Sequence, residues 1–234
     1  MRYTVCGIEI RSENAAKPGS SAGRWIIDWI STLERNGAAL DLGCGKFRYT
    51  VHLARRLYRV TAVDSPEQIG RTQLLFGDHC SLREYAARNL PNVNVYAIEE
   101  SGWQRRLYPV ILCSNVLSAI PCARTRQEVV RNAYNRLRPG GQFLMTTQYR
   151  NSHFTGWQTD PRARRHLDGF LVAHARGTSF YGLIKAAALA RLCHKTGFTV
   201  IRSGHVKELA YVLATRVATA ERGPKAIKKR SDAL

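Results

Sequence analysis

The sequence predicts an α/β fold in which a doubly wound, mostly parallel sheet of seven strands carries helices on both faces. Five short apolar runs alternate with segments of helical spacing, as parallel strands joined by right-handed crossovers do. Two more apolar runs near the carboxyl end predict an antiparallel completion of the sheet. With 234 residues, the chain is long enough for one such domain and a sizeable core.

The first elements follow from apolar spacing. Trp25, Ile26, Trp29, Ile30 and Leu33 recur at helical intervals, which predicts a helix over 22–35 that covers the sheet. Next come predicted strands over 38–42, 58–64 and 93–98, with helices over 51–57 and 67–89 between them.

The second half continues the alternation. It predicts strands over 109–117 and 142–148, separated by a helix over 124–137. A helix over 187–197, ended by Gly197, precedes strands over 198–204 and 208–217.

Composition divides the chain into three parts. Residues 1–21 contain the turn-forming KPGSS cluster and are predicted to be a leader. Residues 22–216 form the domain. Within it, 149–181 lacks periodicity and predicts an inserted loop with a short helix on the substrate side. Residues 217–234 are polar and basic, and they predict a flexible tail.

Several classes of protein are disfavoured. No apolar run approaches the ~20 residues that cross a bilayer, so no membrane segment is expected. Glu9 and Arg11 interrupt the region where a secretory signal would need apolar residues, which favours a cytoplasmic location. The six cysteines show neither C-x-x-C nor Cys/His ligand spacing, so neither a metal site nor a disulfide framework is predicted.

The charge is unusual. Lys and Arg number 36 against 17 Asp and Glu, a net charge of +19. Such a field attracts polyanions, so nucleic acid or another acidic partner is one interpretation. A basic surface without a specific polyanionic partner is the other.

A glycine turn follows the strand over 38–42. Gly43 and Gly45, with Cys44 between them, permit positive φ and let backbone N–H groups approach a ligand. Asp64 closes the next strand, 19 residues after Gly45, where a carboxylate can accept hydrogen bonds from ribose hydroxyls. An N-cap for the helix after Ser65 and Pro66 is the alternative role of Asp64.

Two nucleoside cofactor classes share this geometry. A dinucleotide site needs a third glycine where this chain has Arg48, so NAD is disfavoured. Asp41, two residues before Gly43, can order the turn and face a cation, which favours a sulfonium nucleoside.

With its LDLGCG motif (40–45), the chain resembles the class I S-adenosylmethionine-dependent methyltransferases, over about residues 22–215. The resemblance implies a Rossmann-like fold, with Asp64 on the ribose and Glu99 or Glu100 near the adenine. It further implies that the segment after the fourth strand forms the floor under the cofactor. The expected cofactor residues are Asp41, Gly43, Cys44, Gly45, Asp64, Ser65, Glu99, Ser114 and Asn115.

One position departs from the family pattern. Many members carry a third glycine two residues after the second, and this chain has Phe47 there. A bulky residue at this point predicts a change in how the loop packs over the amino-acid end of the cofactor.

The methyl acceptor is expected beyond the fourth and fifth strands, near 114–121 and 147–154. There, Tyr149 and His153 are the candidate catalytic bases, with Arg150 and Asn151 as possible acceptor contacts, although an exposed polar loop explains the same residues. The Cys113–Val116 segment lacks the Pro-Pro-aromatic motif of methyltransferases that act on DNA amino groups.

The sequence thus predicts a methyltransferase with an unidentified acceptor. An acidic molecule, a nucleic acid or another small metabolite all fit. Phe180, Tyr181 and other aromatics of the insert suit a small-molecule pocket as well as base stacking. The rival hypothesis is a nucleic-acid-binding module that keeps this fold without catalysis.

Overall fold

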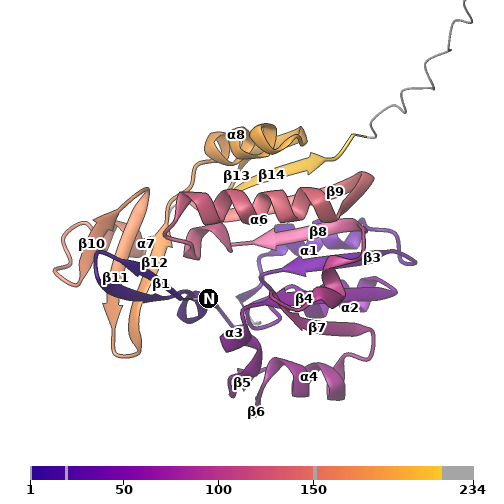
Figure 1. Cartoon of the computed structure of the whole chain (residues 1–234), viewed down its shortest axis with the longest axis horizontal. Coiled ribbons are helices and arrows are strands. Elements are labelled where there is room, and N and C mark those ends of the chain that lie inside the picture. Colours follow the sequence, from indigo (N-terminus) through magenta and orange to yellow (C-terminus); the bar gives the residue numbers. More distant parts are fainter. Residues whose placement is uncertain (1, 19–20, 150–151, 218–234) are drawn as a thin grey trace, which may run out of the picture.

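The computed structural model describes residues 2–18, 21–149 and 152–217. They form two main sheets, one of seven strands at the centre and one of five strands at its side (Figure 1). The predicted basic tail lies almost entirely outside these residues. No described helix has both the length and the apolar character needed to span a membrane.

The central sheet has the order β13-β14-β9-β8-β3-β4-β7. Neighbours among β7, β4, β3, β8 and β9 are parallel, whereas β14 is antiparallel to both β9 and β13, so the predicted fold class is confirmed. Its strands are β3 (Ala38–Leu42), β4 (Arg59–Asp64), β7 (Val93–Ala97), β8 (Tyr108–Ser114), β9 (Leu137–Gln148), β13 (Thr199–Val206) and β14 (Leu209–Thr215). The strand order reverses at β3, between β4 and β8, which is where parallel α/β sheets open a ligand crevice.

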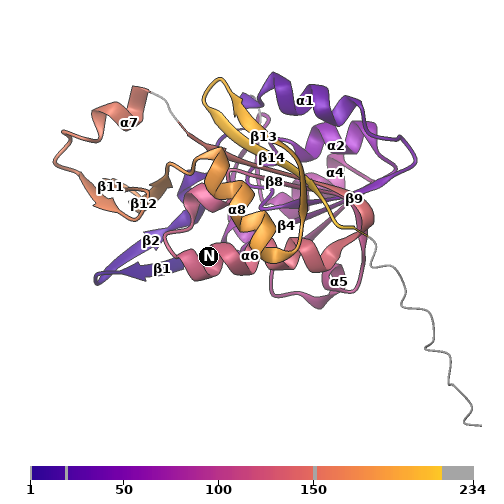
Figure 2. The same ribbon diagram turned by 90° about the horizontal axis from the view of Figure 1, so that it is seen from above.

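Helices cover both faces of this sheet (Figure 2). On one face lie α1 (Arg24–Ser31), α2 (Thr50–Arg56) and α4 (Leu82–Asn89), and on the other α5 (Ser101–Gln104), α6 (Ala123–Arg136) and α8 (Ala186–Thr196). As predicted, α8 ends at Gly197, whose φ of 105° suits glycine.

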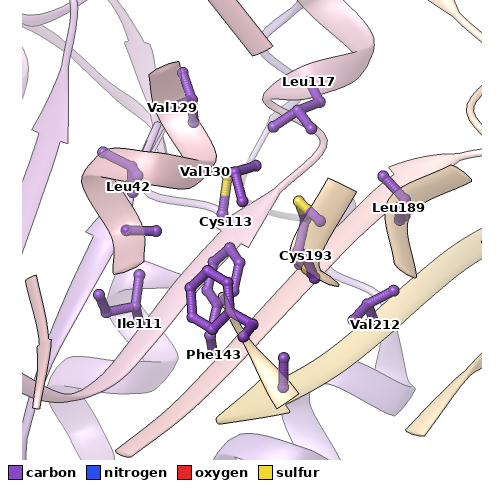
Figure 3. Packing of buried hydrophobic residues seen from close by; sticks show 14 of the residues in the cluster. Leu42, Ile111, Cys113, Leu117, Val129, Val130, Phe143, Leu189, Cys193 and Val212 are labelled. Atoms are coloured by element: carbon purple, nitrogen blue, oxygen red, sulfur yellow. The ribbon is translucent and has the colours of Figure 1, made fainter. Parts of the chain in front are cut away.

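The larger core cluster lies between the sheet and the α6/α8 layer (Figure 3). Ile111 and Phe143 from the strands meet Val130 of α6 and Leu189 of α8, and all four are fully buried. Apolar burial of this kind is the main source of folding free energy, and it fixes the strand ends that bear the site.

The helix predicted over 67–89 is wrong, because two short strands interrupt it. The chain forms α3 (Pro66–Gly70), β5 (Gln73–Leu75), β6 (Asp78–Cys80) and then α4. Phe76 and Gly77 make the turn between the strands with φ of 51° and 107°. Ser81 then starts α4 through a capping box with Glu84, which marks a new helix.

The second sheet replaces the loop predicted for the insert. It contains β10 (Ala163–His166), β11 (Gly169–His174) and β12 (Gly177–Gly182), after the short helix α7 (Ser152–Gly156). Here β11 pairs antiparallel with both of its neighbours. These strands have only four to six residues each, which is too short to show a clear periodicity, so the sequence suggested irregular structure.

The N-terminal segment is part of the same sheet rather than a simple leader. Strands β1 (Arg2–Val5) and β2 (Ile8–Arg11) form a hairpin, and β2 lies parallel to β12 through the pair Thr178 and Ile10. A 3-10 helix, η1 (Ser12–Ala15), follows the hairpin, and another, η3 (Leu117–Ala119), follows β8.

Three contacts fix the second sheet and the adjoining η1 helix to the chain that follows β8 and to the start of α6. The Ser12 hydroxyl donates to the carbonyl of Ala119 at 2.8 Å, and His166 Nε2 lies 2.9 Å from the carbonyl oxygen of Pro121. Arg126 of α6 binds Asp168, between β10 and β11, through two hydrogen bonds. The second sheet therefore stands next to the ends of the central strands.

Candidate functional site

A cavity opens at the carboxyl ends of β3, β4 and β8, at the reversal of strand order. It holds about 1260 Å³, counting the space that opens to solvent. The central sheet supplies one wall. The N-terminal segment and residues Phe180 and Tyr181 of β12 supply the other.

The predicted glycine turn lines this cavity. Gly43 and Gly45 have φ of 80° and 57°. A Cβ atom on Gly43 would overlap the Val116 Cγ2 methyl, so this position requires glycine for both space and conformation. The amides of Gly43 and Cys44 donate to the carbonyl of Val63 at 2.7 and 3.1 Å, which ties the turn to β4.

Asp64 holds the same turn from the second strand. Its Oδ2 accepts a hydrogen bond from the Gly45 amide at 2.8 Å, and its Oδ1 accepts one from the Ser65 amide at 2.8 Å. Burial raises the pKa of Asp64, and these two hydrogen bonds oppose that rise. Each carboxylate oxygen keeps a further lone pair for a ligand in the cavity.

Ser65, and not Asp64, caps the N-terminus of α3. The Ser65 hydroxyl accepts a hydrogen bond from the Gln68 amide at 3.3 Å at the start of α3, and Ser65 also lines the cavity. Asp64 thus remains available to a ligand.

Asp41 is buried beneath the turn, with 2% of its surface exposed. Its Oδ2 accepts a hydrogen bond of 2.6 Å from the Thr50 hydroxyl, which joins the end of β3 to the start of α2. Burial raises the pKa of Asp41 to about 7, and the nearby charge of Asp64 acts in the same direction. A cation in the cavity would favour the ionised form.

The other predicted residues around the turn and β8 also line the cavity. Burial raises the pKa of the Cys44 thiol, so it stays protonated. The Ser114 hydroxyl lies 2.9 Å from that of Thr146. Asn115 has a φ of 61°, and its buried Oδ1 has no hydrogen-bond partner among the described residues.

Buried acceptors without a partner in the described ranges, such as Asn115 Oδ1, indicate that a ligand with hydrogen-bond donors fits the cavity. Oε1 of Gln68, which lines the cavity, likewise lacks a partner within the described part of the chain. A buried acceptor without a donor costs ~1–3 kcal/mol, which a ligand with hydroxyl and amino groups would offset. Together with the open space above Gly43, these acceptors suit a nucleoside with an amino-acid side chain.

Phe47 does not pack over the ligand, contrary to the prediction that it changes the packing of the loop over the amino-acid end of the cofactor. Its ring is fully buried in a cluster beside Tyr85, with ring centroids 6.2 Å apart, and it does not line the cavity. The backbone at Phe47 has a φ of 59°, the left-handed conformation for which glycine is suited. The substitution therefore strains the loop backbone, and its ring packs into the core instead of over the ligand.

The predicted adenine contact is absent from the cavity wall. Glu99 is exposed and lies outside the lining. Glu100 accepts a hydrogen bond from the Ala97 amide at 2.9 Å and pairs with Arg83, so its carboxylate is engaged elsewhere. Ile98 lines the cavity at this strand end and makes it apolar.

The structure locates the side chain of one of the two candidate catalytic residues, Tyr149, and that one does not line the cavity. The Tyr149 ring lies 4.4 Å from that of His205, and Tyr149 is not part of the lining. The backbone of His153 belongs to α7, but its side chain lies outside the described residues, as do Arg150 and Asn151. Gln148, the last residue of β9, lines the cavity instead.

Sequence reasoning missed the contribution of the N-terminal segment. Tyr3, Ser12, Glu13 and Lys17 all line the cavity. The alternation of side chains on either side of the Cys6–Gly7 pair was the available signal, since it matches a hairpin with a two-residue turn. No group of three or more His, Cys, Asp or Glu side chains within the described ranges is arranged to hold a metal ion.

Comparisons with known proteins agree with this geometry. A family model described as a methyltransferase domain matches residues 20–203. The uncharacterized protein YmfD of Escherichia coli (strain K12) is 36% identical over 212 residues, which are 91% of this chain and 95% of YmfD.

Solved structures of similar fold include two methyltransferases. A SAM-dependent methyltransferase of Methanosarcina mazei superposes with a TM-score of 0.60 at 16% identity, covering 85% of this chain and 100% of that one. The Burkholderia thailandensis 1,6-didemethyltoxoflavin-N1-methyltransferase, solved with 1,6-didemethyltoxoflavin and S-adenosylhomocysteine, gives a TM-score of 0.53 at 20% identity. The match covers 79% of this chain and 72% of that one.

Proposed function

This chain belongs to the S-adenosylmethionine-dependent methyltransferases, and from that premise we propose that it methylates a small acidic acceptor held between its two sheets. S-adenosylmethionine supplies an activated methyl group on a sulfonium leaving group. The observation that carries the proposal is the cavity, which has a wall from each sheet and unpaired cationic side chains beside it.

The residues around the glycine turn fit the cofactor. In this proposal Asp64 accepts a hydrogen bond from the ribose, as the family resemblance implies. Gly43 and Gly45 have no side chains, so the ligand can approach the backbone of the turn closely. Asp41, buried below the turn, contributes negative charge toward a cationic ligand.

The acceptor space lies on the far side of the same cavity. Ser118 and Gln148 line it from the ends of η3 and β9, and Phe180 and Tyr181 line it from the second sheet. Tyr3 reaches it from β1. Because aromatic side chains of the second sheet form one wall, the space favours a small molecule over a long polymer.

A cluster of positively charged side chains beside the cavity favours an acceptor with a negative charge. Lys46 lines the cavity, and burial together with the charges of Arg71 and Arg176 lowers its pKa. Neither Lys46 nor Arg176 belongs to the ion pairs found within the described part of the chain. A carboxylate or phosphate on the acceptor would relieve this repulsion.

The protein's own contribution to the reaction is mainly positional. Holding a nucleophile in line with the methyl group replaces a bimolecular encounter by a local one, which accounts for much of the rate in such reactions. Burial raises the pKa of the Tyr3 phenol, so Tyr3 stays protonated at neutral pH and acts as a hydrogen-bond donor. No histidine lines the cavity among the residues that the structure describes.

Methyl transfer into fractionated cell extract tests the proposal. We expect label from radioactive S-adenosylmethionine in small molecules that an anion exchanger retains, with the same yield after nuclease treatment. The Lys46→Gln variant should raise the KM for the labelled acceptor about tenfold, as expected for the loss of a charged hydrogen bond. Lys195→Gln, at an exposed position near the end of α8, is the matched control.

A nucleic-acid acceptor is the second candidate, because the chain carries a net charge of +19 and exposes Arg164 and Arg165 on β10. Label that appears only in nuclease-sensitive material would overturn the small-molecule proposal in its favour. Absence of any cofactor binding by the purified protein would contradict both.

A further inference from the structure

Glu13 has a buried carboxylate oxygen for which the described residues offer no hydrogen-bond partner. It lies in η1, before the residues matched by the family model, which begin at position 20. Its Oε2 atom is inaccessible to solvent and has no hydrogen-bond partner among the described residues, yet Glu13 lines the cavity. A carboxylate oxygen in this state costs folding free energy unless a ligand supplies a donor.

The position of Glu13 is fixed from two sides. The neighbouring Ser12 hydroxyl donates to the Ala119 carbonyl, after β8, at 2.8 Å. Asn14 Nδ2 donates to the carbonyl of Arg176, at the turn before β12, at 3.1 Å. The 3-10 helix thus connects the central fold with the second sheet and carries Glu13 between them.

Glu13 lies at the same end of the cavity as Asp64. Arg71 Nη2 donates to the backbone carbonyl of Glu13 at 2.8 Å, and the Arg71 charge interacts with both Glu13 and Asp64. Ala16, three residues further on, faces the glycine turn, because a Cβ on Gly45 would lie 3.6 Å from the Ala16 Cβ. The N-terminal segment therefore covers the part of the cavity where Asp64 and the glycine turn meet.

We infer that Glu13 is a cofactor-binding residue whose Oε2 accepts a hydrogen bond from a hydroxyl or amino group on the nucleoside half of the cofactor. This rests on the proposed function. Glu13 and Asp64 then hold the nucleoside from opposite walls, one from the N-terminal segment and the other from β4. The site needs both sheets to be complete.

Isothermal titration of S-adenosylhomocysteine into the full chain tests the inference. Glu13→Gln keeps the size of the side chain and removes its charge, so we expect at least tenfold weaker binding. Glu9→Gln is the matched control, because Glu9 lies in the same N-terminal segment, pairs with Arg2 and Arg11, and does not line the cavity. Its affinity should stay within about twofold of the wild type.

Ligand analogues separate a direct contact from a structural effect. If Glu13→Gln weakens S-adenosylhomocysteine but not its 2′-deoxy or 3′-deoxy form, that hydroxyl is the partner of Glu13. If it weakens all three equally while the urea midpoint is unchanged, the amino group is the partner.

Two results overturn the inference. If the wild type binds S-adenosylhomocysteine and Glu13→Gln binds it with the same affinity, the inference is wrong. The proposed function is then unaffected. A wild type that binds neither S-adenosylmethionine nor S-adenosylhomocysteine removes the proposed function first.

Discussion

Arg126 and Asp168 face each other across the junction of the two sheets, with Nη1–Oδ2 and Nη2–Oδ1 distances of 2.7 and 2.9 Å. The Arg126 side chain is only 10% exposed, and its Nε donates to the Ile120 carbonyl at 2.8 Å. Its guanidinium lies 5.4 Å from the ring centroid of Phe180, which lines the cavity. The ion pair therefore positions one wall of the site.

Removing the negative partner should loosen this junction. Asp168→Asn leaves the Arg126 charge buried without its carboxylate, and we expect a loss of about 2 kcal/mol in the free energy of unfolding by urea. Asp160→Asn is the control, because its partner Arg162 has a 74% exposed side chain, and its loss of stability should be the smaller of the two. Equal losses in the two variants would contradict the role of the buried pair.

Asp41 should make stability depend on pH. Its pKa is raised from 3.8 to about 7 in the folded protein, so the native state keeps a proton that the unfolded state has lost between these values. The free energy of unfolding therefore falls as pH rises from about 4 to 7, by about 1.4 kcal/mol per unit, and it is level above that range.

Asp41→Asn removes this titration and serves as the comparison. Urea unfolding of both proteins between pH 5 and 8 should show the wild type losing stability relative to the variant up to pH ~7. Parallel curves across this range would show that Asp41 is ionised in the native state.

Gly43 should tolerate no side chain, because of its neighbour as well as its φ. Gly43→Ala places a methyl group against Val116, so we expect cofactor affinity to fall at least tenfold in titration calorimetry. Gly140→Ala has a similar φ of 74° with no atom within 4 Å of its Cβ, and it should cost ~1–2 kcal/mol without affecting binding. Adding Val116→Ala to Gly43→Ala should recover part of the affinity, and no recovery would rule out the clash.

At position 47 a glycine variant should be more stable than an alanine variant, which is the reverse of the usual order. Both Phe47→Ala and Phe47→Gly lose the buried ring, which costs ~3–5 kcal/mol. The glycine variant also relieves the φ of 59°, so it should be more stable than the alanine variant by ~1 kcal/mol in urea unfolding. Both should bind the cofactor like the wild type where they are folded, since Phe47 does not line the cavity; weaker binding would contradict this placement.

The central sheet could be predicted because its signals are local. Strands β3, β4, β7, β8 and β9 each contain an apolar run, and Gly43, Gly45 and Asp64 stand at fixed positions at the ends of the first two. The carboxyl ends of adjacent parallel strands lie at one edge of the sheet, so residues distant in sequence could be assigned to one site.

The second sheet and its part of the site could not be predicted in this way. The pairing of Ile10 with Thr178 depends on contacts between segments far apart in the sequence, and short strands carry little periodicity of their own. The prediction of a simple leader over 1–21 therefore left Glu13 and Tyr3 out of the site. The prediction of an adenine contact at Glu99 or Glu100 failed for another reason. The Glu100 carboxylate accepts a hydrogen bond from the Ala97 amide, and Ile98 lines the cavity in its place.

The junction of β2 with β12 also sets an order of events during synthesis. The Ser179 hydroxyl donates to the Arg11 carbonyl at 3.5 Å, across 168 positions of sequence. At ~5–20 residues per second, the β1–β2 hairpin leaves the ribosome roughly 10–30 s before its partner strand exists. Until then Ile10, buried in the finished protein, has no sheet to pack against. The newborn chain can thus pair the central strands from β3 to β9 early, but it becomes able to enclose a ligand only when its first residues meet β12.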